Sequence, residues 1–499
     1  MNLSSLIKKT ANAYPEKTAI IEDGEEISYK HLWQEIESLS NALRSIGIRK
    51  NTRVALILPN CKEFIYSFFA LLTINAIAIP LKPQMTCWEF HGIFKNGNPK
   101  ALILTSHLLN KILTEKPSLL KNRIIIVKEE KQDIRIMDKD GHLENLPLYT
   151  LSTLLEMGKG EGTRTRRIQT PSQQVASINY TYRGYGYPLG AMLTHHNYIH
   201  GAIRYIKLVR IQPDMRILLL LPVSHIFPLT GCVLVPLLAK ATVVISTAIN
   251  PKKVFQTIEK NKVNVLVCVP TLYEFLVKHY DHTKWDISSL LFGISGAESL
   301  PMDLYNNIRS KMGIDVIQGY GLTETLPVTC NPRFGNKPET IGIRGHDVKL
   351  KIVDKENREC KTDETGEIIV KCPSVMLGYY KAPKETMDVI QNGWFYTGDY
   401  GMMDNEGYVY FKGLKKSIAK IDGITVDLNE IKNVLSLKNK VIIHCVYPIE
   451  LVEKSGQKMK KGIVVLFSTK DNIDCSYISN FLLPRLIHYK FPKKFIKIK

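Results

Sequence analysis

The sequence predicts an α/β protein, because of its length and because of how its apolar residues are spaced. The chain has 499 residues, of which 44% are hydrophobic. This number of hydrophobic residues is too large for one compact core, so we expect about two to four domains or subdomains. Segments with helical spacing alternate with short apolar runs along much of the chain, which is typical of parallel sheets layered with helices.

The first elements follow from local patterns. Residues 19–27 alternate around an Asp-Gly turn, which predicts a β-hairpin. Residues 28–46 carry apolar side chains at helical spacing and end before a glycine, which favours a helix. Residues 54–58 are continuously apolar and predict a buried strand.

The same alternation returns further along the chain. Residues 251–262 and 302–312 have helical patterns, and an apolar strand pattern follows each of them, at 263–269 and 316–319. We therefore expect further helices packed on a parallel sheet. From residue 342 onwards the pattern changes to short β segments with turns between them, which predicts a small β subdomain.

Two apolar runs, residues 64–81 and 217–246, resemble membrane spans. Ser, Thr and Asn interrupt the first run, and several Pro residues, a His and a Lys interrupt the second. Neither is a clean stretch of about 20 apolar residues. We expect buried helices followed by strands.

The nine cysteines stand singly and form no CxxC pair, which argues against zinc ribbons and thioredoxin-like sites. An odd number of cysteines in mostly apolar surroundings indicates reduced core thiols in the cytosol. The first 13 residues lack the apolar core of a signal peptide. We expect a cytoplasmic protein with at most peripheral membrane contact.

The chain is strongly basic, with a formal net charge of +20. Residues 411–499 hold 17 Lys and one Arg against seven acidic residues, a surplus of 11 positive charges. Such a chain can bind nucleic acid, an anionic membrane or an acidic protein. A solvated lysine surface explains the same composition without any partner.

The segment 180–191 reads YTYRGYGYPLGA between an apolar strand pattern and an expected helix. A strand, a glycine-rich loop and a helix start can together bind phosphate through free backbone N–H groups. A Gly/Pro turn without a ligand explains this segment equally well on its own. Three residues elsewhere can also be explained without a functional role: His225 as a buried histidine, Glu324 as a helix N-terminal acid and Asp399 as a turn residue.

Further motifs follow in a fixed order: LPVSHIF at 221–227, SGAESLP at 295–301, QGYGLTET at 318–325 and WFYTGD at 394–399. Together with the loop they closely resemble the acyl-CoA synthetase and adenylation-domain superfamily, from about residue 3 to the end. The resemblance implies a two-step reaction. A carboxylate attacks the α-phosphate of ATP to give an acyl-adenylate and pyrophosphate, and a thiol of CoA or of carrier-protein phosphopantetheine then displaces AMP.

The resemblance implies catalytic roles for four residues. Glu324 is an oxygen donor suited to Mg²⁺ between phosphates, and Thr323 can donate a hydrogen bond to the α-phosphate. His225 would lie where the acyl carboxylate meets ATP. The catalytic residues implied are Thr323, Glu324, His225 and Lys420.

Implied nucleotide contacts are more numerous. Tyr320 can stack on adenine, Asp399 can accept both ribose hydroxyls, and the segment 296–298 would lie along adenine and the acyl pocket. The nucleotide-binding residues implied are Thr181, Gly184, Gly186, Gly190, Gly296, Ala297, Glu298, Gln318, Gly319, Tyr320, Gly321 and Asp399.

The phosphate loop departs from the family. Where related proteins have Ser, Gly, Thr, Thr and Lys, this chain has Tyr182, Arg183, Gly184, Tyr185 and Leu189. The expected cradle for β- and γ-phosphates is therefore aromatic and less cationic. Arg183 can return part of the charge from a different place.

The C-terminal region departs as well. Leu414 replaces the hinge Arg, while Lys416, Lys420 and Gly423 keep family positions. The stretch around Lys490 resembles the approach to the family's last catalytic Lys, which would fall beyond Lys499. We expect a shortened C-terminal domain in which that role has no residue.

The changes in sequence pattern along the chain and the family resemblance together predict the domains. Residues 1–412 form an AMP-binding domain with lobes at about 1–170 and 171–340 and a β subdomain at about 341–412. A solvated linker at 157–174 joins the lobes. Residues 413–499 form a small mobile α+β domain, with strands expected at 441–446 and 462–468.

Two functions remain open. The first is an ATP-dependent acid–thiol ligase, and the apolar residues around His225 favour a fatty or aryl acid. The second is a relative without adenylation that binds acyl groups or nucleotide or docks a carrier protein. Because acyl carrier proteins are acidic, the basic C-terminal domain predicts carrier docking. We expect no nucleic-acid partner.

Overall fold

The computed structural model describes residues 2–129, 146–159, 170–171, 173–247, 249–414, 418–421, 424–436, 441–452, 459–469 and 473–498. Two residues to which the sequence analysis gave family positions, Lys416 and Gly423, lie outside the described residues. So do Lys499 and most of the expected linker at 157–174.

The first sheet has the strand order β7-β6-β5-β3-β4-β8-β9. Its strands run parallel except at the β8–β9 hairpin. In chain order the strands are β3 (Arg53–Ile57), β4 (Ile77–Pro80), β5 (Ala101–Thr105), β6 (Ile124–Lys128), β7 (Leu148–Thr150), β8 (Val175–Thr181) and β9 (Leu189–Thr194).

The second sheet has the order β16-β15-β14-β13-β12-β10-β11-β1-β2, and it is parallel from β14 to β1. Its strands are β1 (Thr18–Glu22), β2 (Glu25–Ser28), β10 (Arg216–Leu219), β11 (Thr242–Ile245), β12 (Val265–Cys268), β13 (Phe292–Ser295), β14 (Val316–Leu322), β15 (Leu326–Cys330) and β16 (Ile343–Arg344). Mixed helices and parallel strands confirm the predicted α/β class.

Helices pack on both sheets. They are α1 (Leu3–Ala13), α2 (Tyr29–Ser45), α3 (Lys62–Thr73), α4 (Cys87–Gly97), α5 (Ser106–Glu115), α6 (Leu151–Met157), α7 (His195–Val209), α8 (Ile226–Pro228), α9 (Val235–Leu238), α10 (Pro251–Lys260), α11 (Pro270–His279) and α12 (Met302–Met312). A short 3-10 turn, η1 (Pro117–Leu119), and a π-helical turn, η2 (Leu229–Leu234), complete this set.

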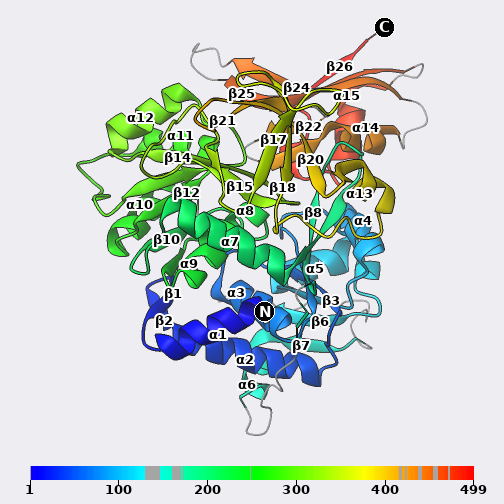
Figure 1. Cartoon of the computed structure of the whole chain (residues 1–499). Coiled ribbons are helices and arrows are strands. Elements are labelled where there is room, and N and C mark those ends of the chain that lie inside the picture. The colour runs from blue at the N-terminus through cyan, green and yellow to red at the C-terminus, as the bar shows by residue number, and fades with distance from the viewer. Residues whose placement is uncertain are drawn as a thin grey trace.

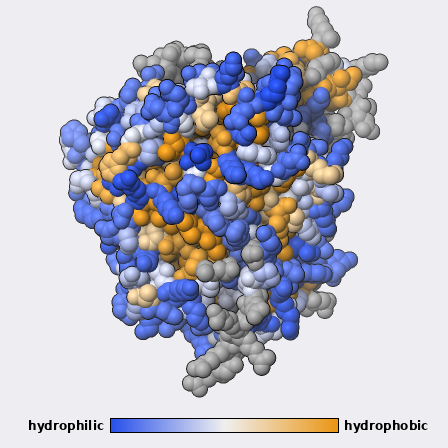
Figure 2. Space-filling model, in the orientation of Figure 1, coloured by the Kyte–Doolittle hydropathy of each residue, from blue (hydrophilic) through white to orange (hydrophobic). Residues whose placement is uncertain are grey.

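The two membrane-like apolar runs are buried core. In α3 every residue from Phe64 to Leu72 is buried, as expected of a helix that is apolar on all sides. It packs against α1 and α2 and leads into β4. Among the described residues, no helix is long and apolar enough to cross a membrane. On the face in Figure 2, hydrophobic residues gather in patches between hydrophilic ones.

The division into sheets differs from the expected division into lobes near residue 170. Strands β8 and β9 complete the first sheet, while β1 leaves the N-terminal segment and pairs with β11 in the second. Ile20 and Ile27 of the predicted hairpin are buried there. Local patterns predict the hairpin, but its partner is chosen by packing with a segment some 220 residues away.

The β subdomain has the order β17-β18-β20-β19, with β21 paired to β20. Its elements are β17 (Lys349–Val353), β18 (Gly366–Lys371), α13 (Pro383–Val389), β19 (Ile390–Gln391), β20 (Trp394–Met403) and β21 (Val409–Leu414). Asp399 lies within β20, where it pairs with Leu414.

The C-terminal segment forms a hairpin and a three-stranded sheet of order β24-β25-β26 in its described part, packed with helices. Its elements are β22 (Ile418–Ile421), β23 (Ile424–Asp427), α14 (Leu428–Ser436), β24 (Ile442–Val452), β25 (Met459–Ser468), α15 (Cys475–Leu482), η3 (His488–Lys490) and β26 (Lys494–Lys497). In Figure 1 these orange and red elements lie across the top, away from α1 and α2.

Candidate active site

A cavity of about 1040 Å³ lies where the two lobes, the β subdomain and the C-terminal segment meet. One wall comes from residues that follow neighbouring strands of the second sheet: 221–228 after β10, 296–299 after β13 and 319–324 at the end of β14. Ligands of open parallel sheets bind at the carboxyl ends of the strands. Further lining comes from 180–183 and from the C-terminal segment.

Most of the candidate residues line this one cavity. Motifs spread over more than 200 residues of sequence are therefore brought together in space. The candidates that line it are Thr181, His225, Gly296, Ala297, Glu298, Gly319, Tyr320, Gly321, Thr323, Glu324, Asp399 and Lys420.

Two other candidates hold the scaffold instead. The side-chain amide of Gln318 accepts from the Leu300 N–H at 2.8 Å and donates to the Thr340 carbonyl at 3.2 Å. Gly190 pairs with Tyr180 inside the β8–β9 hairpin, and a Cβ there would lie 2.6 Å from Ile178. Both residues are used in packing, and neither lines the cavity.

Gly184 and Gly186, expected to bind phosphate, face the C-terminal segment. The N–H of Gly186 donates to Oδ2 of Asp427 at 2.9 Å. Asn429 donates to the Gly184 carbonyl at 2.9 Å, and Asn433 donates to the Gly186 carbonyl at 3.2 Å. Both glycines have positive φ, so they give the loop the turn that this docking requires.

Glu324 is buried and already has partners. Its Oε1 accepts from the Tyr379 hydroxyl at 2.6 Å and lies 3.3 Å from Nε of Arg183. In the sequence, Arg183 stands out as a loop substitution that can return part of the lost positive charge. The structure places it beside Glu324 of the QGYGLTET motif.

Tyr320 and Asp399 form a second buried contact. The Tyr320 hydroxyl donates to Oδ2 of Asp399 at 2.6 Å, and the Tyr320 ring lies 6.4 Å from the ring of Phe411. Burial raises the pKa of Asp399, against the hydrogen bond from Tyr320 and the positive charge of Arg183, which lower it. An aromatic ring and a carboxylate beside each other suit a base and its ribose.

The segment 296–298 is tightly packed. A Cβ on Gly296 would lie 2.9 Å from the ring of Phe227, so no larger residue fits without moving that ring. Ala297 adopts φ +67°, a left-handed conformation that is uncommon outside glycine and frequent at functional sites. Glu298 is buried, with the ammonium of Lys461 3.9 Å away.

His225 lies at the start of α8 and is neutral in this setting. Burial lowers its pKa well below the usual value, and the charges of Lys82 and Lys420 act in the same direction. Burial also lowers the pKa of Lys420, while Asp399 and Glu298 raise it. Apolar residues near His225 in the chain and after β12 also line the cavity: Leu221, Ile226, Phe227, Pro228, Val269 and Leu272.

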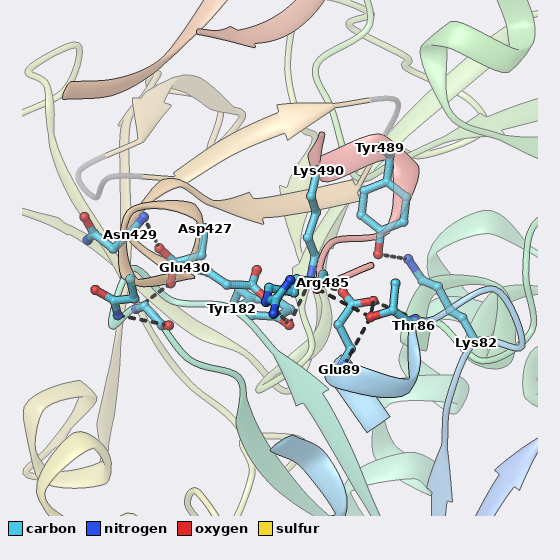
Figure 3. A network of polar contacts seen from close by, with 12 residues as sticks. Lys82, Thr86, Glu89, Tyr182, Asp427, Asn429, Glu430, Arg485, Tyr489 and Lys490 are labelled. Atoms are coloured by element: carbon cyan, nitrogen blue, oxygen red, sulfur yellow. Dashed lines mark hydrogen bonds and ion pairs between the residues drawn. The ribbon is translucent and has the colours of Figure 1, made fainter. Parts of the chain in front are cut away.

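Figure 3 shows a polar network that the sequence analysis did not find. The buried ammonium of Lys490 donates to Glu89 at 2.7 Å, to the Tyr182 hydroxyl at 2.9 Å and to Glu430 at 3.0 Å. The ammonium of Lys82 donates to the Tyr489 hydroxyl at 2.8 Å. The network thus joins α4, the β8–β9 loop and the C-terminal segment.

One signal for this network was present in the sequence. Thr86 and Glu89 form a capping box at the start of α4, which the T-x-x-E spacing predicts. Oε2 of Glu89 accepts from the Thr86 N–H, and this leaves Oε1 for Lys490. Lys490 lies 401 residues away in the chain, so the local sequence around Glu89 does not predict this contact.

Comparison with known proteins agrees with this geometry. Residues 7–380 match the family described as AMP-binding enzyme. A long-chain-fatty-acid–CoA ligase of Bacillus subtilis (strain 168) is 28% identical over 515 residues, covering 99% of this chain and 90% of that protein. An indoleacetate–CoA ligase of Aromatoleum aromaticum is 27% identical over 501 residues, covering 99% and 94%.

Solved structures show the same fold. An amide bond synthetase from Marinactinospora thermotolerans has a TM-score of 0.84 at 18% identity, covering 100% of this chain and 96% of that one. A long-chain-fatty-acid–CoA ligase from Archaeoglobus fulgidus has a TM-score of 0.80 at 22% identity, covering 100% and 97%. With three quarters of its length matched, the chain belongs to the AMP-binding enzyme family.

Proposed function

We propose that this protein is an AMP-forming acid–thiol ligase that acts on an apolar carboxylic acid. One observation carries the proposal: a single cavity joins a polar cluster to an apolar wall. The polar cluster contains Tyr320, Asp399, Lys420 and Glu324, and the apolar wall includes the residues that follow His225 in the chain. An acyl group and a nucleotide fit such a cavity side by side.

The proposed roles follow from the positions. Asp399 accepts the ribose hydroxyls, and Tyr320 lies along the base. Lys420 and Thr323 lie where a phosphate would meet the acyl carboxylate, and a cation and a hydroxyl there stabilise negative charge in the transition state. The carboxylate attacks the α-phosphate and pyrophosphate leaves. A thiolate then attacks the acyl carbon and AMP leaves.

The relatives support the class of acid. They include a long-chain-fatty-acid–CoA ligase, an indoleacetate–CoA ligase and a feruloyl-CoA synthase, so a fatty or aryl acid is proposed here. The apolar wall of the cavity agrees with both. The proposed thiol is that of CoA or of the phosphopantetheine of a carrier protein.

The experiment is a panel assay. The purified protein is incubated with ATP, CoA and each of a series of fatty, phenylacetic and cinnamic acids, and AMP and acyl-CoA are measured by mass spectrometry. Stoichiometric AMP and acyl-CoA from at least one acid is the expected result. If the folded protein gives neither thioester nor ATP–pyrophosphate exchange with any acid, the proposal is wrong.

A second candidate is a family member that binds acyl groups or nucleotide without the adenylation step. It is favoured by the Arg183–Glu324 pair and by the docking of Gly186 on Asp427, since both occupy groups expected to serve MgATP. Calorimetry separates the candidates. Tight binding of AMP with negligible binding of ATP would support the second one.

For the acceptor we propose an acidic carrier protein that docks on the basic C-terminal segment. Among its described residues, lysines 432, 461, 493, 494 and 497 are exposed. Complementary charge accelerates such docking and makes it sensitive to salt. Activity with carrier that is unchanged between low and high salt, or a clear preference for CoA, would refute this.

A further inference from the structure

The ion pair between Arg183 and Glu324 lies inside the cavity, out of contact with solvent. Nε of Arg183 is 3.3 Å from Oε1 of Glu324, and the side chains are 4% and 1% exposed. Removing two charges from water is costly, and the cost is offset only where further hydrogen bonds hold them. Nη2 of Arg183 has such hydrogen bonds, whereas Nε faces Glu324 without a hydrogen bond of its own.

Three groups of β20 fix the guanidinium. Nη2 of Arg183 donates to the Thr397 carbonyl at 2.6 Å and lies 3.4 Å from the Tyr396 carbonyl. The guanidinium carbon is 5.5 Å from the ring centroid of Phe395. Burial acts to lower the pKa of Arg183, but Glu324 and Asp399 raise it above its usual value. The positive charge is therefore permanent and its position is set by the sheet.

The family implies Mg²⁺ at Glu324, and the residues around this carboxylate do not fit it. Mg²⁺ prefers oxygen ligands at about 2.0–2.1 Å in near-octahedral geometry. Oε1 of Glu324 instead accepts from Tyr379 and faces the guanidinium of Arg183. A divalent cation here would lie against a fixed positive charge.

We propose that Arg183 takes the place of Mg²⁺ as the fixed cation of the nucleotide subsite, so that the nucleotide phosphate binds without metal. Arg183, Thr323 and Lys420 line the same cavity, and an arginine can bind phosphate through charge-assisted N–H bonds. The inference rests on the proposed function, because it assumes that the cavity takes a nucleotide. Arg183 acts here as a residue that determines which form of nucleotide is bound.

The experiment measures AMP and ATP binding by calorimetry in EDTA and in excess Mg²⁺. For the wild type we expect affinities that change less than about threefold between the two conditions. Arg183→Gly, which restores the residue type of the family loop, should bind both nucleotides about tenfold more weakly in EDTA. Excess Mg²⁺ should recover part of the ATP affinity of that variant.

Two further variants serve as controls. Arg358→Gly removes an exposed arginine bound to Asp354 and Glu356 in a turn of the β subdomain, and it should bind nucleotide as the wild type does. Arg183→Lys keeps a cation and should keep metal-independent binding at reduced affinity. If Arg183→Gly does not fold, the inference is still tested by the wild-type affinities in EDTA and in Mg²⁺ and by the affinities of Arg183→Lys.

The inference is overturned if wild-type ATP binding tightens tenfold or more with Mg²⁺, or if neither nucleotide binds in either buffer. It is also overturned if Arg183→Gly keeps wild-type affinity in EDTA. The panel assay distinguishes a failure of this inference from a failure of the proposed function. Acyl-CoA formation by a protein that needs Mg²⁺ to bind ATP would refute the inference alone. Metal-independent nucleotide binding without any thioester or exchange would refute the function alone.

Discussion

Asp427 accepts the backbone N–H of Gly186 at 2.9 Å, so a carboxylate of the C-terminal segment binds the loop that the sequence assigns to phosphate. Asp427 is fully buried and also accepts from the N–H of Asn429. Burial raises the pKa of Asp427, against the backbone hydrogen bonds that lower it. The loop N–H group thus already has an anionic partner from the same chain.

Replacing that anion should favour a nucleotide with more phosphates. In Asp427→Asn the side chain keeps its shape but loses the charge that competes with a polyphosphate for the loop N–H groups. We expect the affinity for ATP relative to AMP to rise about threefold to tenfold, in keeping with hydrogen bonds to charged groups. Calorimetry with both nucleotides measures the ratio.

Asp474→Asn is the matched control, because Asp474 caps α15 in the same domain by accepting from the Tyr477 N–H. It should leave the ratio of ATP to AMP affinity unchanged. An unchanged ratio in Asp427→Asn as well would show that the Gly186 contact does not compete with nucleotide.

Lys490→Met should destabilise the whole chain strongly. The ammonium is 1% exposed and balances the carboxylates of Glu89 and Glu430. Removing one partner of a buried ion pair leaves uncompensated charge and costs about 3–5 kcal/mol. Urea denaturation measures the free energy of unfolding, and Lys494→Met, at an exposed lysine of β26, is the control. A loss equal to that of the control would contradict the structural role of the network.

The pH dependence of stability should carry the signature of Lys82. Burial and the charge of Lys490 lower the pKa of Lys82 to about 7 in the folded chain, whereas unfolded lysine titrates near pH 10.4. Between these values the unfolded state binds more protons, so this group makes stability rise with pH from about 7 to about 10. Below pH 7 the folded state carries the full penalty of the buried charge.

Lys82→Met removes this contribution. The difference in unfolding free energy between variant and wild type, measured in urea at several pH values, should therefore favour the variant most at pH 6.5 and decline towards pH 9.5. The lost hydrogen bond to Tyr489 shifts the difference by a constant. A difference that does not vary with pH would show that Lys82 titrates normally.

Asp399→Asn should abolish recognition of the ribose. A carboxylate that accepts from both hydroxyls makes AMP bind more tightly than 2′-deoxy-AMP, by about tenfold for one hydrogen bond to a charged group. The variant should weaken AMP binding by at least that factor and bind the two nucleotides equally. Asp404→Asn, at a half-buried ion pair with Lys337 beyond β20, is the control. If Asp399→Asn still binds AMP more tightly than 2′-deoxy-AMP, the ribose does not bind at this carboxylate.

The sequence by itself determined the local elements. The hairpin at 19–27, the α2 helix capped by Ser28, and α12 at Met302–Met312 appear where the patterns predicted them. Turn chemistry, capping and helical periodicity depend on residues within a few positions of one another. The motifs likewise predicted that Thr323, Glu324 and Asp399 belong to one nucleotide site. All three line the same cavity.

Only the tertiary structure decided the partners. It paired β1 with β11, brought Arg183 to Glu324 and joined Lys490 to Glu89 across 401 residues. It also turned Gly184 and Gly186 towards the C-terminal segment. Burial and ion pairing depend on which distant segments pack together, and a local pattern carries no record of that choice, because the energy of a buried charge is set by its neighbours in space.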